Sequence, residues 1–273
     1  MIIPAQLRTR MVEKIWGRAD LPAPFAARAS GEQAGALIGE IWFEPPREFD
    51  RLLVKYLFTN EKLSVQVHPS DAQAQDGEHG KEECWLVLDA VPGAQLGIGF
   101  KQDIAPPAIA AAALDGSIED LLDWHTVKAG DFFYLPAGTV HAIGPGLSLI
   151  EIQQNSDTTF RLFDYGRPRD LHLERGVAVA NGGPHDPALR RSLGVNGNAQ
   201  LAEGPHFRAD RIAGKPADDV AARYSGPALI MPLEGVVNIG AIRIEAGECG
   251  LAQTLSAADF AEAVSTVVAQ PVV

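Results

Sequence analysis

The chain has 273 residues, 46% of them hydrophobic and 21% charged, which is the composition of a soluble globular protein with one large or two modest domains. Its 35 acidic residues outnumber 23 lysines and arginines, and the net charge of −12 argues against nucleic acid or an anionic membrane as a partner, although a local cluster of cations could still bind a phosphorylated sugar. Two widely separated cysteines, Cys84 and Cys249, predict neither a disulfide framework nor a thiolate zinc site, and without an apolar run of membrane-spanning length we expect a cytoplasmic protein.

The first part of the chain predicts β-strands. Residues 36–43 and 52–58 form apolar runs bounded by glycine, proline and acidic residues, as strands do. Lys55 interrupts the second run. On spacing alone, a lone lysine in such a run is more often an edge residue with its charge in water than a functional group.

The next stretch carries the polar side chains of greatest interest. A strand places residues two apart on one face, so Ser64, Gln66 and His68 are expected to share a face. A polar loop then leads into an apolar strand that begins near Glu83. Lys81 should lie on the same face as Glu83, and we weigh a functional role for it evenly against simple pairing with a neighbouring glutamate.

The middle of the chain adds one more candidate ligand and a change of structure. An aromatic strand ends in a Pro-Ala-Gly turn, after which His141 opens the following strand. Alanine-rich and acidic sequence predicts a small helical insertion near 103–124. Strand character returns at 147–154, and Arg161 follows among arginines and aromatics that composition alone reads as a solvated edge.

The end of the chain predicts a second, smaller β domain. Residues 181–205 are rich in glycine, proline and asparagine and are expected to link residues 1–180 to residues 206–273. The last segment has short apolar runs with Gly and Pro turns, which favour antiparallel strands, and its only histidine is at position 206. We expect no metal site in it.

Four polar residues on the predicted strands form a candidate metal site. A lone histidine is more often a structural residue than a ligand. Two imidazoles, a carboxylate and an amide oxygen on strands of one barrel are, however, a set that suits a divalent first-row metal and leaves it a net positive charge. The expected ligands are Gln66, His68, Glu83 and His141.

The same residues resemble motifs of a known family. The turn from Gly130 to His141 resembles the second motif of the cupins, and Gln66-x-His68 with Glu83 resembles a variant of the first. The glutamine and the long loop before Glu83 are features of type I mannose-6-phosphate isomerases, particularly of their short bacterial form. The matching stretches are Glu13–Gly17, Lys55–His68, Gly80–Trp85, Pro92–Ala94 and Gly130–Arg167.

The resemblance implies a fold and an activity. The fold would be all-β: a cupin double-stranded β-helix, or jelly-roll, barrel with the helical insertion and a second, smaller degenerate β domain. The activity would be a metal-dependent aldose–ketose isomerisation between mannose 6-phosphate and fructose 6-phosphate through a cis-enediol, with one divalent ion, zinc. Arg161 and Lys81 would be catalytic, and Ser64, Lys55 and Trp16 would bind the substrate.

Two other classes of function remain open at this point. Two histidines and one carboxylate also form the facial triad of iron oxygenases. A cupin that binds a sugar phosphate without turnover is the third class, although Lys81 and Arg161 beside a complete ligand set favour catalysis. The sequence does not decide the sugar phosphate, the metal used in the cell, the catalytic base, the oligomeric state or the role of the C-terminal domain.

Overall fold

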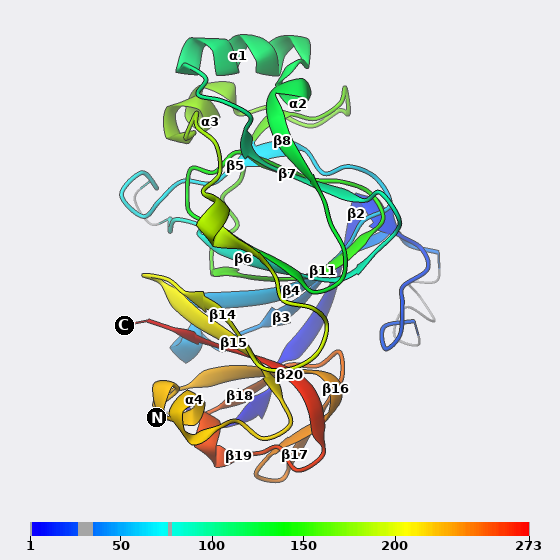
Figure 1. Cartoon of the computed structure of the whole chain (residues 1–273), viewed down its shortest axis with the longest axis vertical. Helices are drawn as coiled ribbons and strands as arrows, with labels where there is room; N and C mark the ends of the chain where they lie inside the picture. The colour runs from blue at the N-terminus through cyan, green and yellow to red at the C-terminus, as the bar shows by residue number, and fades with distance from the viewer. Residues whose placement is uncertain (1, 27–34, 76–77, 273) are drawn as a thin grey trace.

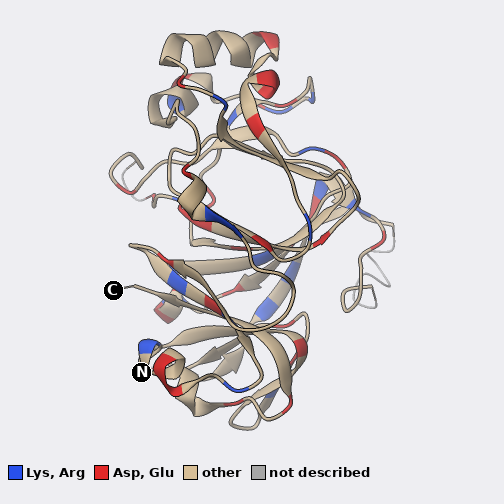
Figure 2. Cartoon of the chain, in the orientation of Figure 1, with Lys and Arg blue, Asp and Glu red and all other residues tan. Residues whose placement is uncertain are grey.

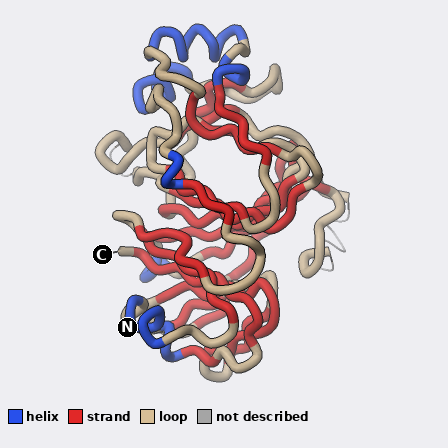
Figure 3. Tube along the Cα trace, in the orientation of Figure 1, coloured by secondary structure: helices blue, strands red, loops and turns tan. Residues whose placement is uncertain are grey.

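The protein is built mainly from antiparallel β-sheets, with short helices at its two ends (Figures 1 and 3). The structure is a computed structural model, and it describes residues 2–26, 35–75 and 78–272. The four α-helices are α1 (Pro106–Asp115), α2 (Ile118–Leu121), α3 (Leu173–Val179) and α4 (Asp218–Arg223). Single 3₁₀ turns lie at η1 (Arg47–Phe49), η2 (Pro187–Leu189) and η3 (Leu255–Ala257).

The first part of the chain forms two sheets. A seven-stranded sheet has the order β13-β9-β6-β11-β4-β3-β2, and a five-stranded sheet has the order β12-β5-β10-β7-β8. The strands of the first are β2 (Arg8–Arg18), β3 (Ile38–Glu44), β4 (Leu52–Phe58), β6 (Glu83–Ala90), β9 (Asp131–Leu135), β11 (Leu147–Gln154) and β13 (Arg190–Ser192). Those of the second are β5 (Val65–Val67), β7 (Gln95–Phe100), β8 (Leu122–Thr126), β10 (His141–Ile143) and β12 (Phe160–Phe163).

A third sheet forms most of the C-terminal part. Its eight strands run in the order β1-β18-β16-β20-β15-β14, with β17 and β19 also paired to β16. They are β1 (Ala5–Gln6), β14 (Ala199–Glu203), β15 (Phe207–Ala213), β16 (Ala228–Ile239), β17 (Ile242–Glu245), β18 (Gly250–Ala252), β19 (Ala258–Asp259) and β20 (Ala263–Pro271). Because β1 pairs with β18, the N-terminus is part of this sheet.

The sheets are held together by separate hydrophobic layers. Side chains of the seven-stranded sheet, such as Phe43 and Ile150, share one core with Phe207 and Leu229 of the C-terminal sheet. The opposite face of the seven-stranded sheet contributes residues such as Trp85 to a second core between it and the five-stranded sheet. These two sheets curve around this core and together form a barrel (Figure 1). Helices α1 and α3 cover the outer face of the five-stranded sheet through a third core (Figure 1). The seven-stranded sheet is therefore buried on both faces, which explains its long apolar runs.

Several expectations from the sequence agree with these elements. The predicted strands at 52–58 and 147–154 match β4 and β11, and α1 and α2 lie within the expected insertion near 103–124. The expected link at 181–205 is more ordered than its composition indicated. It contains β13, which pairs with β9 of the barrel, and β14, which pairs with β15 of the C-terminal sheet. Among the described residues, no helix is long and apolar enough to cross a membrane.

Candidate metal centre and active site

Three predicted ligands come together inside the barrel. His68, Glu83 and His141 are all buried, and one ligating atom of each lies within 4.8 Å of the others. His68 Nε2 is 3.6 Å from one Glu83 oxygen, and His141 Nε2 is 3.4 Å from the other. The antiparallel pairing of β5 with β10 and of β6 with β9 brings these distant segments together.

The two histidines are oriented as metal-binding histidines usually are. His68 Nδ1 lies 2.9 Å from the Thr158 carbonyl and His141 Nδ1 lies 2.9 Å from the Thr139 carbonyl, so each Nδ1–H donates and leaves Nε2 as the acceptor. Burial lowers the pKa of His68 well below its usual value and lowers that of His141 to about 4. Both imidazoles are therefore neutral near pH 7, which is the form that binds metals.

Gln66, the fourth candidate ligand, lies beside this group. Gln66 on β5 is paired with His141 on β10 in the sheet register, and its amide Nε2 lies 3.2 Å from His141 Nε2. Rotating the amide by half a turn exchanges its nitrogen and oxygen, and the network of neighbours decides between the two orientations. A metal at His141 favours the orientation with the amide oxygen inward.

The Glu83 carboxylate is the best test of whether this group fits a cation. Neither of its buried oxygens has a well-directed hydrogen bond among the described residues, although Lys81 Nζ lies 3.1 Å from Oε2. Burial, followed by repulsion from Glu151, raises its pKa to about 7 in spite of Lys81. A buried carboxylate without directed donors is costly unless a cation compensates it. The donor set therefore fits a divalent metal ion.

A polar cavity of about 180 Å³ opens beside this group. It is lined by side chains from both barrel sheets and from the loops that follow β5 and β11. Five of the residues predicted from the sequence to act on the substrate line it, and so does the predicted ligand Gln66. The lining residues are Lys14, Trp16, Glu40, Lys55, Leu57, Leu63, Ser64, Gln66, Lys81, Glu151, Asp157, Thr159, Arg161 and Arg169.

Glu151 is the central residue that the sequence reading missed. Its carboxylate lies 3.3 Å from Lys55 Nζ and 3.8 Å from Lys81 Nζ, and it accepts a hydrogen bond of 3.0 Å from Trp85 Nε1. Burial alone would raise its pKa, but Lys81 and Lys55 outweigh burial and lower the pKa to about 2. A glutamate in the apolar run at 147–154, directly opposite Lys55 on paired strands, was the available signal.

The other predicted substrate residues lie around the cavity at different depths. Ser64 and Trp16 are each 3% exposed, and Ser64 Oγ lies 3.3 Å from the Gln66 amide oxygen. Lys55 is equally buried, and its ammonium lies 4.3 Å above the Trp42 ring. Arg161 is half-buried on β12, where it pairs with Gln66, and its guanidinium donates to the Asp170 carbonyl at 3.3 Å.

Lys81 is a charged ammonium among these protein groups. Burial alone would lower its pKa, but Glu83 and then Glu151 outweigh burial, so the pKa of Lys81 is raised. The ammonium also lies 3.2 Å from His68 Nε2, and its acidic partners are Glu83 and Glu151 rather than the loop glutamates considered from the sequence.

Comparison with known proteins identifies the family. A mannose-6-phosphate isomerase from Streptococcus mutans is 34% identical over 246 residues, which cover 76% of this chain and 78% of the relative. The chain belongs to the mannose-6-phosphate isomerase family. No family model matches the chain.

Solved structures of mannose-6-phosphate isomerases share the fold. The enzyme from Bacillus subtilis is 24% identical, with a TM-score of 0.75 and alignment over 98% of this chain and 99% of that one. A zinc-bound holo structure of a mannose 6-phosphate isomerase is 13% identical with a TM-score of 0.67, covering 99% of this chain and 100% of that one. At these identities the likeness concerns the fold alone.

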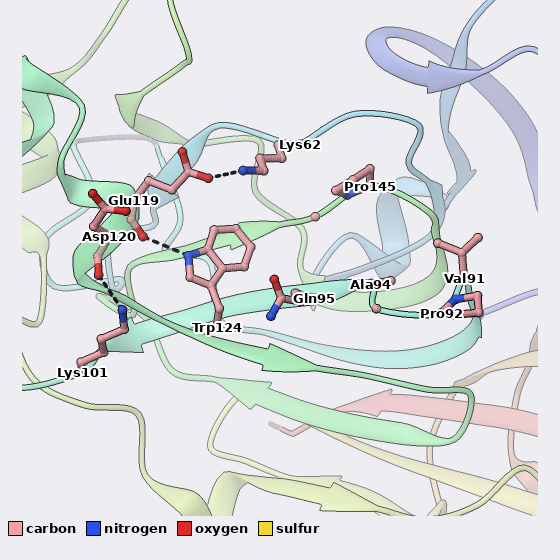
Figure 4. Close-up of a pocket in the computed structure, with 12 residues that line it drawn as sticks. Lys62, Val91, Pro92, Ala94, Gln95, Lys101, Glu119, Asp120, Trp124 and Pro145 are labelled. Carbon is pink, nitrogen blue, oxygen red and sulfur yellow. Dashed lines mark hydrogen bonds and ion pairs between the residues drawn. The ribbon is translucent and has the colours of Figure 1, made fainter.

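A larger cavity, of about 480 Å³, is lined by residues other than those of the candidate metal centre (Figure 4). Trp124 is among the residues that line it, and none of the site residues predicted from the sequence does so. Its lysines are already engaged, since Lys62 pairs with Glu119 and Lys101 donates to the Asp120 carbonyl at 2.7 Å. The smaller cavity, which is lined by the candidate ligand Gln66 and by buried charged residues, is therefore the candidate active site.

Proposed function

We propose that this protein interconverts mannose 6-phosphate and fructose 6-phosphate in a single metal-dependent active site. Membership of the isomerase family supports this activity. The observation that carries it is the Glu83 carboxylate: it lies without directed hydrogen bonds between two neutral imidazoles, beside a cavity that also holds Lys81 and Glu151. We also infer that the five- and seven-stranded sheets form a cupin jelly-roll barrel.

The proposed ligands are the set expected from the sequence, and zinc is the proposed metal. His68 and His141 would bind through Nε2, Glu83 through its carboxylate and Gln66 through its amide oxygen. When bound there, zinc would act as a Lewis acid on the substrate's C1 and C2 oxygens. The lysines and arginines around the cavity add positive charge locally, although Figure 2 shows acidic and basic residues interspersed over both halves of the molecule.

The proton transfers are assigned to Lys81 and Glu151. Isomerisation moves a proton between C1 and C2 and another between the two oxygens, through a cis-enediol. Lys81 is an ammonium that can donate to the developing oxyanion, and Glu151 is an ionised carboxylate that can accept a proton, with 3.8 Å between their charged atoms. Lys55 lies 3.3 Å from the Glu151 carboxylate and holds it in place, so it is assigned the role of a positioning residue.

The phosphate end of the substrate is assigned to the outer part of the cavity. Arg161 lines it with a planar guanidinium that suits two oxygens of a phosphate or an enediolate. Ser64 contributes a hydroxyl beside Gln66, and Trp16 forms a wall. Lys55 would act on the phosphate through its charge alone, since it lies deeper and pairs with Glu151.

A coupled assay on mannose 6-phosphate tests the proposal. Wild-type protein should produce fructose 6-phosphate, lose activity after treatment with a chelator, and regain it when zinc is restored. His141→Ala should lose both zinc and activity, because it removes a proposed ligand whose Nε2 lies 3.4 Å from a Glu83 oxygen. Full activity in zinc-free His141→Ala protein would refute the proposal. Oxygen uptake by iron-loaded protein, or substrate binding without turnover, would instead favour an oxygenase or a sugar-phosphate sensor.

A further inference from the structure

Glu82, the residue before the proposed ligand Glu83, faces away from the proposed metal site. Along β6 the side chains alternate: Trp85 packs inside the barrel, and Cys84 packs in the core shared with the C-terminal sheet. Glu82 lies two residues before Cys84, so its side chain lies on the same face, toward the C-terminal sheet, and it is buried there. Its carboxylate accepts a hydrogen bond from the Tyr134 hydroxyl.

A turn of the C-terminal sheet closes over this pair. Gly204 begins the turn between β14 and β15, and a Cβ atom placed on it would lie 1.8 Å from the Tyr134 hydroxyl oxygen and 3.2 Å from a Glu82 oxygen. Only glycine fits there without movement of the tyrosine. The Tyr134 ring also lies 5.7 Å from the ring of Phe207, which ends the same turn.

The same turn is also connected to the backbone of Glu82, through Gln154 and Asp71. The Gln154 side chain accepts from the Glu82 N–H at 2.9 Å, and the Gln154 N–H donates to the Glu82 carbonyl at 3.0 Å. The Gln154 amide donates to the Asp71 carboxylate at 3.2 Å, and His206 Nδ1 lies 3.7 Å from that carboxylate. Both the side chain and the backbone of Glu82 are thus held by groups that contact residues 204–207.

We propose that the turn at residues 204–206 positions the metal-binding strand, and that Glu82 and Tyr134 transmit its position to Glu83. Directed hydrogen bonds to the Glu83 carboxylate are lacking among the described residues, so the place of its oxygens depends on the backbone at residues 82–84. Metal ligands must be held to within about 0.5 Å for full affinity. The C-terminal domain therefore contributes to metal affinity without supplying a ligand, an inference that rests on the metal site proposed above.

Zinc affinity of the metal-free protein, measured by competition with a chromophoric chelator, tests this role. Tyr134→Phe removes one oxygen from the contact, and we expect about tenfold weaker zinc binding, the effect typical of losing a residue that orients a ligand. Gly204→Ala should weaken zinc binding similarly because its Cβ displaces the hydroxyl. Glu82→Gln keeps an acceptor for Tyr134 and should bind zinc nearly normally, whereas Glu82→Ala should not. The effects of Tyr134→Phe and Gly204→Ala should not add, since both break one contact.

Tyr224→Phe is the matched control. The Tyr224 hydroxyl donates to the buried Asp210 carboxylate at 2.5 Å, so this variant loses the same kind of bond within the C-terminal domain. It should lower the melting temperature of the metal-free protein about as much as Tyr134→Phe, yet leave zinc affinity unchanged. Unchanged zinc affinity in Tyr134→Phe, or an equal loss in Tyr224→Phe, would overturn the inference.

The zinc measurement also separates this inference from the proposed activity. Wild-type protein that binds zinc but does not isomerise mannose 6-phosphate would refute the activity, while a tenfold loss in Tyr134→Phe would still support the positioning role. Wild-type protein that does not bind zinc would overturn both.

Discussion

Lys55 and Glu151 face each other on the paired strands β4 and β11, and their charged atoms lie 3.3 Å apart inside the barrel. Both side chains are almost completely buried. Each charge has a further partner: the Lys55 ammonium lies over Trp42, and the Glu151 carboxylate accepts from Trp85. Because buried charges are tolerated only with compensating partners, this pair couples the stability of the barrel to the electrostatics of the active site.

Breaking this pair from one side should be costly. Among the described residues, Lys55→Met leaves the Glu151 carboxylate with the more distant Lys81 as its cationic partner. We expect the free energy of unfolding to fall by about 3 kcal/mol, as for other broken buried pairs. Urea denaturation at pH 7 measures the change. The double variant Lys55→Met/Glu151→Gln should recover part of the loss, because it removes both charges.

An exposed ion pair provides the comparison for that measurement. Arg243 contacts Glu245 and Glu262 on the surface of the C-terminal domain. Arg243→Met should therefore change the free energy of unfolding far less than Lys55→Met does, because solvent screens the exposed pair. A Lys55→Met effect no larger than this would contradict the role assigned to the buried pair.

Stability should also depend on pH through Glu151. Its pKa is lowered from the ordinary 4.5 to about 2 in the folded protein, so the unfolded chain binds the proton more readily. The carboxylate therefore stabilises the fold fully above about pH 4.5, and this contribution is lost as the pH falls toward 2. With a chelator present, the difference in unfolding free energy between wild type and Glu151→Gln should shrink between pH 7 and pH 3.5. A difference that stays constant would show that Glu151 is not ionised by its partners.

The sequence was sufficient for those parts of the site that depend on local pattern. Alternation along one strand placed Gln66 near the histidines, and the turn before His141 predicted the start of β10. Convergence of these residues in space is a property of strand pairing, which single-strand patterns do not contain. The resemblance to a known family predicted that these residues meet in space, and periodicity alone did not.

The residues that the sequence did not reveal are those whose role depends on a partner from another strand. Glu151 resembles any charged residue in an apolar run until Lys55 and Lys81 are seen beside it. The raised pKa of Lys81 has the same origin, since it follows from two carboxylates that only the fold brings near. The strands within 181–205 are three and five residues long and lie in Gly-rich sequence, so they carry little pattern to detect.

Lys81→Met should separate metal binding from catalysis. Its removal takes a positive charge from beside Glu83, so zinc should bind at least as well as in wild type. The turnover number should fall by about 10²–10⁴, the usual contribution of a positioned acid or base. Metal analysis and the coupled assay on one preparation measure both quantities. Zinc-loaded Lys81→Met with wild-type turnover would exclude Lys81 from proton transfer.

Arg161 should affect substrate binding as well as turnover. Arg161→Lys keeps the charge but loses the planar fork, so we expect KM for mannose 6-phosphate to rise with a smaller change in kcat, whereas Arg161→Ala should impair both. Arg175 is a suitable control, since it lies on α3, pairs with Glu78 and does not line the cavity. Arg175→Ala should retain wild-type kinetics. An unchanged KM in Arg161→Ala would mean that the phosphate does not bind at this residue.

Gln66 should set the charge of the metal centre. With a neutral amide as the fourth ligand, two imidazoles and the Glu83 carboxylate leave a bound zinc ion with one net positive charge. Gln66→Glu would cancel that charge, so it should bind zinc more tightly while weakening polarisation of the substrate oxygens. We expect turnover to fall about tenfold or more as zinc affinity rises, whereas Gln66→Ala should lose affinity and activity together. Measuring zinc affinity by chelator competition beside kcat distinguishes the two patterns, and parallel losses in both variants would mean that Gln66 orients His141 without contacting the metal.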